Sequence, residues 1–78
     1  MITYEDVLKE LEGLSEEKFA AFQRRIIRDD KLKIAGVRTP ALRALAKKYK
    51  GEHEAFSRFP DEFYEVVFLK LSLAAALP

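Results

Sequence analysis

Few of the residue types that do chemistry stand together in this sequence of 78 residues. His53 is its only histidine, and Glu52 and Glu54 flank it. That setting is more typical of a surface histidine than of a general base or a metal ligand. Asp29 and Asp30 are adjacent carboxylates in an expected turn, but no calcium-loop pattern surrounds them. We therefore expect neither a metal site nor a catalytic histidine.

Signatures of nucleophilic catalysis and of cofactor binding are also weak. The chain has no cysteine, which excludes disulfides, cysteine-ligated zinc and thiol chemistry. Ser15 and Ser57 have no evident activating base, and Ser15 is better explained as a helix cap. The three glycines are too far apart for a phosphate-binding loop or a dinucleotide fingerprint. The sequence predicts no bound cofactor.

Charge is the more informative feature, because the net value of +1 conceals a strong segregation. Residues 1–22 carry a balance of −4, residues 23–50 a balance of +8, and residues 51–78 a balance of −3. A basic block of this kind could follow the phosphate backbone of a nucleic acid, with weak and nonspecific binding, because backbone contacts read no bases. The alternative is a solvated face paired with the acidic helices. The candidate backbone-binding residues are Arg24, Arg25, Arg28, Arg38, Arg43, Lys47 and Lys50.

Helical spacing gives the basic block a geometry. Arg43, Lys47 and Lys50 follow one another at i, i+4 and i+7, which places them on one face of a helix. Thr39 is the expected N-cap of that helix, with Pro40 at its first helical position, and the N-terminal N–H groups beside Arg38 would suit a phosphate oxygen.

The elements that carry these residues are expected to be helices, so the fold class is all-α, built of antiparallel helix pairs in a single domain, residues 1–78. Thr3 is the expected N-cap of a first helix that ends near Gly13, and Ser15 that of a second. The short connector between them predicts an antiparallel hairpin. The second helix has an apolar stripe formed by Phe19, Phe22, Ile26 and Ile27.

The second half of the chain is expected to hold three further helices. Residues 29–39 are interpreted as an extended connector whose apolar side chains fill the core, with a short edge strand as the alternative. A helix from Thr39 to about Gly51, a short one over 52–58 and a last one from Pro60 to about 77 follow. The expected buried face of the first of these comprises Leu42, Leu45, Ala46 and Tyr49.

The last helix is apolar around most of its circumference from Val66 onward. Such a helix is normally buried on all sides, and five short helices are too few to surround it. We therefore expect a homo-oligomer or a partner chain that covers it. The candidate interface residues are Val66, Val67, Phe68, Leu69, Leu71, Leu73 and Leu77.

Several motifs resemble the N-terminal region of DNA alkylation repair proteins. They are FQRRII at residues 22–27, IAGVRTPALR at 34–43 and LAK at 45–47, and the GVRTPxLR core is the most distinctive. The opening YEDVLxxL and the later FYExxxLK fit the same pattern. The resemblance covers nearly the whole chain. It implies an all-helical solenoid of HEAT-like repeats, from a family of DNA glycosylases that remove alkylated purines over a basic concave surface.

The resemblance also implies that this chain corresponds to roughly the first third of a family member. The aspartate, tryptophans and arginine that line the lesion site in active members fall in later repeats, so no catalytic residue is carried over. We expect a scaffold that is inactive alone, and the question of enzyme activity stays open. The acidic N-terminus does not resemble a secretory signal, and the 12 residues from Val66 to Leu77 are too few to cross a bilayer. The expected location is cytoplasmic, away from membranes.

Overall fold

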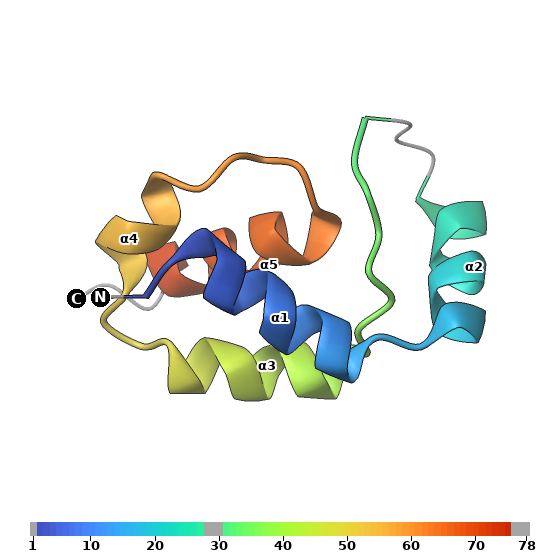
Figure 1. The fold of residues 1–78 in the computed structure, drawn as a ribbon, viewed down its shortest axis with the longest axis horizontal. Helices are drawn as coiled ribbons and strands as arrows, with labels where there is room; N and C mark the ends of the chain where they lie inside the picture. The colour runs from blue at the N-terminus through green and yellow to red at the C-terminus, as the bar shows by residue number, and fades with distance from the viewer. Residues whose placement is uncertain (1, 28–30, 76–78) are drawn as a thin grey trace.

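The computed structural model describes residues 2–27 and 31–75, which contain five helices (Figure 1). They are α1 (Tyr4–Leu14), α2 (Glu17–Ile26), α3 (Thr39–Lys48), α4 (His53–Ser57) and α5 (Tyr64–Ala75). The all-α prediction is confirmed. Within the described residues, none of these helices is both long and apolar enough to cross a membrane.

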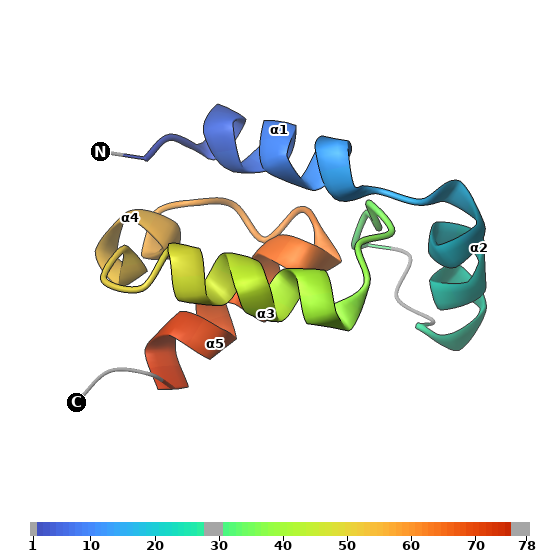
Figure 2. The same cartoon turned by 90° about the horizontal axis from the view of Figure 1, so that it is seen from below.

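Four of the helices, α1, α3, α4 and α5, surround one core, whereas α2 lies at one end of the molecule (Figures 1 and 2). The core is apolar and draws on all four helices. Its buried members are Val7, Leu11, Val37, Leu42, Leu45, Tyr49, Phe56, Val66, Leu69 and Leu73. Three of the four residues predicted for the buried face of α3 are among them, and Ala46 packs against the cluster.

The antiparallel hairpin expected of the first two helices does not form. α2 lies beyond the C-terminal end of α1 and runs across its direction (Figures 1 and 2). The Ser15 hydroxyl donates to the carbonyl of Glu12 at 2.8 Å, so this serine closes α1 and does not cap α2. The residue before α2 is Glu16, whose backbone N–H donates to the carbonyl of Gly36 at 2.9 Å. That bond ties the start of α2 to the connector instead of to α1.

The connector before α3 is extended, as predicted, and its apolar side chains enter the core. Val37 is fully buried and Ile34 is nearly so. The described part of this connector forms no edge strand, which was the alternative, but it makes one isolated parallel bridge, between Lys33 and Phe63. The same bridge delays the start of α5, which begins at Tyr64 and not at Pro60, because the N–H of Tyr64 donates to the carbonyl of Lys33 at 2.8 Å.

One residue of α5 that looks like a surface residue in the sequence holds this connector in place. The Glu65 side chain is completely buried. Its Oε1 accepts the N–H of Ala35 at 3.0 Å, and its Oε2 accepts the N–H groups of Gly36 at 3.0 Å and Val37 at 3.4 Å. The carboxylate thus supplies hydrogen bonds to three donors that the extended chain leaves unpaired.

Gly36 is the point where the connector approaches α2. Its φ is +86°, and a Cβ built there would lie 2.6 Å from the carbonyl oxygen of Glu16 and 2.7 Å from the Cβ of Ala20. Only glycine tolerates both the left-handed backbone and so close a contact. Ala20 is accordingly the one fully buried residue of α2 in the structure.

The apolar residues of α5 and of α2 are divided between the core and the surface. Val66, Leu69 and Leu73 of α5 are buried within the chain, which corrects the expectation that five helices are too few to cover them. Val67 and Phe68 are half-buried, Leu71 is 67% exposed, and Leu77 lies outside the described residues. In the apolar stripe of the second helix, Phe22 is 55% exposed and Ile26 63%, whereas Phe19 and Ile27 are half-buried, so part of the stripe faces solvent.

Candidate nucleic-acid interface

The structure separates the basic residues into those held by carboxylates and those that are not. Ion pairs in the described part of the chain join Lys33 to Glu62 at 3.9 Å, Arg38 to Glu16 at 2.8 Å, Lys48 to Glu10, Arg58 to Glu54 at 3.2 Å, and Lys70 to Asp61 at 2.7 Å. The charges of these cations are partly balanced inside the chain. They are less available to an external anion than cations without such partners.

A group of exposed cations lies on α3 and on the turn that follows it. Arg43, Lys47 and Lys50 are exposed, and none forms an ion pair with any residue in the described part of the chain. They surround a shallow hollow of about 310 Å³ whose other walls include Ser72 and Leu73 of α5. The predicted spacing is therefore confirmed as a shared surface, which we call the α3 cationic face.

This face offers hydrogen-bond donors over an apolar floor. Arg43 and Lys47 of α3, and Lys50 two residues after its end, line the hollow together with Ser72 of α5. Sequence reasoning did not include Ser72 among the site residues. The sequence feature that could have identified Ser72 is its position: it is one of only two polar side chains in the apolar part of the last helix.

Arg38 does not assemble with the N-terminus of α3 in the way the sequence suggested. It directly precedes the helix, but its Nε donates to Glu16 and its guanidinium lies 5.1 Å from the centre of the Phe19 ring. The hydrogen bond with Glu16, followed by the attraction of its charge, raises the pKa of Arg38 above its usual value. The side chain thus links the start of α3 to α2.

The remaining predicted contacts lie elsewhere. Arg24 and Arg25 are exposed on α2, at the end of the molecule where that helix stands apart from the main body (Figures 1 and 2). Arg28 lies outside the described residues. The single basic surface expected from residues 24–50 is thus divided between α2 and the α3 cationic face.

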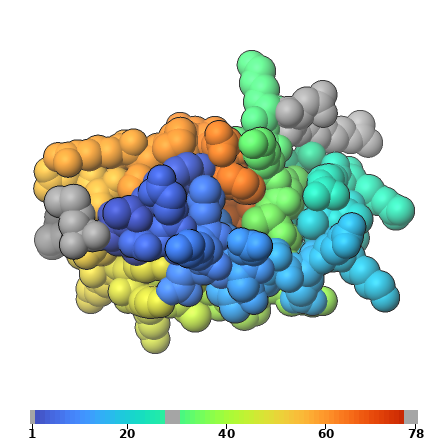
Figure 3. All heavy atoms as spheres, viewed as in Figure 1, coloured from blue at the N-terminus to red at the C-terminus, as the bar shows by residue number. Residues whose placement is uncertain are grey.

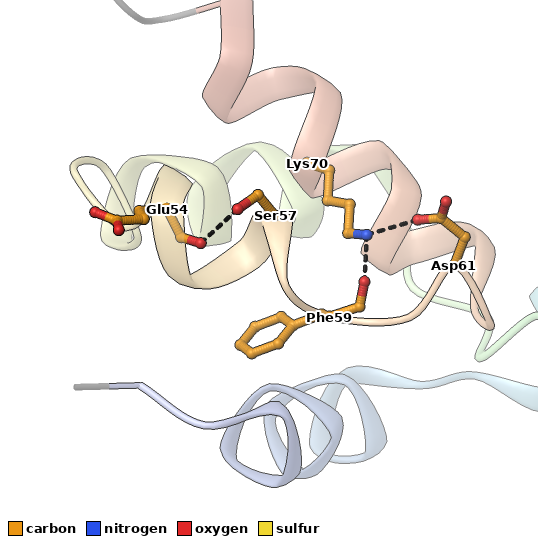
Figure 4. Close-up of polar contacts among 5 residues, drawn as sticks. All are labelled: Glu54, Ser57, Phe59, Asp61 and Lys70. Atoms are coloured by element: carbon orange, nitrogen blue, oxygen red, sulfur yellow. Dashed lines mark hydrogen bonds and ion pairs between the residues drawn. The ribbon is translucent and has the colours of Figure 1, made fainter.

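Residues of catalytic type also gather at one place, between α4 and α5. His53, Ser57, Asp61 and Lys70 line a second hollow, of about 300 Å³. The Ser57 hydroxyl, however, donates to the carbonyl of Glu54 in its own helix at 2.6 Å. Lys70 is bound by Asp61 and by the carbonyl of Phe59 (Figure 4).

These hydrogen bonds show that Ser57 and Lys70 stabilise the local fold of that hollow. Lys70 fastens the turn between α4 and α5 to the side of α5, which explains a lysine in the middle of an apolar helix (Figure 4). The Ser57 proton is engaged by backbone and is not shared with a base. Over residues 2–27 and 31–75, no group of three or more metal-ligating side chains is found. Asp29 and Asp30 lie outside those ranges.

No protein-family model, curated protein or solved structure matches the chain. The functional argument therefore rests on the residues of the site.

Proposed function

We propose that this protein is a non-catalytic helical module that contacts the phosphate backbone of duplex DNA through the α3 cationic face. The observation that carries the proposal is the contrast within the basic residues. Arg43, Lys47 and Lys50 share one exposed surface and have no ion-pair partner among the described residues. By contrast, Lys48, on the same helix, is bound by Glu10.

The length of the face fits a DNA strand. From Arg43 to Lys47 the axis of α3 advances about 6 Å, at about 1.5 Å per residue, and Lys50 follows two residues after the helix ends at Lys48. Successive phosphates of one strand of B-form DNA are spaced by about 3.4 Å along the duplex axis, so Arg43 and Lys47 are separated by about two such intervals. These spacings allow each of the three cations to contact a phosphate of one strand. Contacts of this kind position a protein on DNA without reading its sequence.

The family resemblance supports the same surface, because the GVRTPxLR motif ends at Arg43. It also supports a non-catalytic role, since the residues that line the lesion site in active members have no counterpart in this chain. A HEAT-like scaffold that contacts the DNA backbone, without base excision of its own, is the function we propose.

The test is binding to a fluorescent duplex of random sequence, measured by anisotropy at low salt. We expect the double variant Arg43→Glu with Lys47→Glu to abolish binding. The matched control is Lys9→Glu with Arg24→Glu, which changes the net charge equally but lies on α1 and α2. We expect the control to retain most of the affinity. Equal loss in both variants would show that net charge, and not the α3 cationic face, is responsible, and no binding by the unaltered protein would reject the proposal.

A second candidate function is association through α5, as expected from its apolar composition. The observation that favours it is the exposure of Leu71 beside half-buried Val67. We propose this surface only as the alternative role, because Val66, Leu69 and Leu73 are already engaged in the core. Leu71→Asp tests it, with the oligomeric state measured by analytical ultracentrifugation.

A further inference from the structure

The exposed ridge of α2 is the largest apolar feature that the proposed DNA contact does not use. Phe22 and Ile26 are one turn apart and both more than half exposed, and the ring of Phe19 lies 6.3 Å from that of Phe22. The space-filling view shows α2 at one end of the molecule (Figure 3). An exposed cluster of large apolar side chains on a small protein indicates an interaction surface.

The attachment of α2 prevents this ridge from reaching its own chain. Ala20 faces Gly36, where the two backbones are in close contact. At about 100° per residue, Phe22 is turned about 160° around the helix from Ala20. The ridge therefore points away from the connector that anchors α2. Among residues 2–27 and 31–75, Phe22 and Ile26 of the ridge stay more than half exposed.

A hollow of suitable size and character lies on the other side of the connector. Its volume is about 370 Å³, and its walls are mainly carbon, from Leu8, Leu11, Ala35 and Phe63. An apolar cavity of about 150 Å³ is large enough to hold a benzene ring, so this hollow has room for the Phe22 ring and part of Ile26.

The charges beside the ridge and the hollow are opposite. On α2, Lys18 and Arg25 lie within about 60° of Phe22, whereas Arg24 lies on the far side of the helix. On α1, Glu12 lines the hollow, and Glu5 lies on the same face by helical spacing. None of these four side chains of the ridge and hollow forms an ion pair with a described residue.

We propose that the occupant of the hollow is the α2 ridge of a second copy of this chain. Phe22 and Ile26 of each copy enter the hollow between α1 and the connector of the other, and Lys18 and Arg25 lie beside Glu5 and Glu12. The exchange is reciprocal, so a two-fold axis closes the dimer and each contact occurs twice. This surface is separate from the α3 cationic face, so dimerisation and DNA contact fail independently.

The first test is sedimentation equilibrium of the full chain over a wide concentration range. We expect a monomer–dimer equilibrium that Phe22→Asp weakens by at least about tenfold, as is usual for loss of a central aromatic anchor. Because Phe22 is largely exposed in the monomer, the helix content seen by circular dichroism should not change. Leu71→Asp, on α5, is the comparison and should have no effect. A monomer at all concentrations, or association that only Leu71→Asp disrupts, would overturn the proposal.

The second test exchanges the charges. Lys18→Glu with Arg25→Glu and, separately, Glu5→Arg with Glu12→Arg should each prevent dimerisation, since both junctions then bring like charges together. An equimolar mixture of the two variants should dimerise, because both junctions again pair opposite charges. Arg24→Glu is the matched control on the far side of α2 and should leave association unchanged. Failure of the mixture to dimerise would overturn the proposal, whatever the outcome with DNA.

Discussion

Replacement of Glu65 by glutamine is the sharpest test of how this fold is held together. The buried carboxylate accepts three backbone N–H groups, from Ala35, Gly36 and Val37. Glutamine keeps the shape, but it has one acceptor oxygen, and its amide group must face a donor. If the oxygen stays with Gly36 and Val37, the N–H of Ala35 is left without an acceptor.

The expected cost follows from these three bonds. A bond to a charged group that becomes a bond to a neutral one loses about 1 kcal/mol, and a buried donor left unpaired costs about 1–3 kcal/mol. Together they predict a loss of about 3 kcal/mol from a total stability of about 4–12 kcal/mol for a domain of this size. With a urea m-value of about 1 kcal/mol per molar, the midpoint should fall by about 2–3 M.

The assay is urea unfolding followed by circular dichroism. The matched control is Glu62→Gln, the same chemical change three residues earlier, before α5 begins, at an exposed residue whose Oε1 lies 3.9 Å from Lys33 Nζ. We expect the control to lose less than about 1 kcal/mol, as is usual for exposed ion pairs. Equal midpoints for the two variants would refute the reasoning that the Glu65 carboxylate holds the connector.

Two further substitutions test other parts of the structure. Gly36→Ala should destabilise by about 3 kcal/mol, because it combines a left-handed backbone with a steric clash, whereas Gly51→Ala, also at positive φ but with open space around it, should cost only about 1–2 kcal/mol. Equal costs in urea unfolding would contradict this. Burial, and then the Glu10 carboxylate, raise the pKa of Tyr49 to about 12. The folded state therefore retains a proton that the unfolded state loses above pH 10, and stability should fall as the pH rises from 10 to 12. Tyr49→Phe should reduce that fall in alkaline thermal melts, and an unchanged fall would contradict the assignment.

Local signals in the sequence predicted much of the fold. Thr3 caps α1 in a reciprocal capping box with Asp6, as its position suggested. The proline after Thr39 marks the start of α3, and the period of its apolar residues identified the buried face. These features depend on neighbours within one turn of helix, so they can be inferred from residue order alone.

Features that depend on contacts between distant segments were not predicted. The place of α2 is set by the close approach of Ala20 to Gly36, a contact across 16 residues, and the apolar period of the helix gave no sign that its ridge would face solvent. Glu65 looked like the last polar residue of an amphipathic turn. Its burial follows from unpaired N–H groups about 30 residues away, which no local pattern reveals.

The same distinction applies to the candidate interface. The spacing of Arg43, Lys47 and Lys50 was sufficient to place them on one surface. It was not sufficient to show that Arg38 is held by Glu16, because that pairing depends on how α2 meets the connector. The basic block is thus divided into separate surfaces, and the α3 cationic face is one of the parts that form no ion pair with a described residue.

The salt dependence of DNA binding tests the central proposal most directly. If three cations of the α3 cationic face each neutralise a phosphate, log K should fall with log salt at a slope of about −2.7, or about 40-fold in affinity between 50 and 200 mM salt. Replacing Arg43, Lys47 and Lys50 by alanine should bring that slope close to zero, while Arg24→Ala should leave it nearly unchanged. A slope that is the same in the unaltered protein and in the triple variant would contradict the proposed contact.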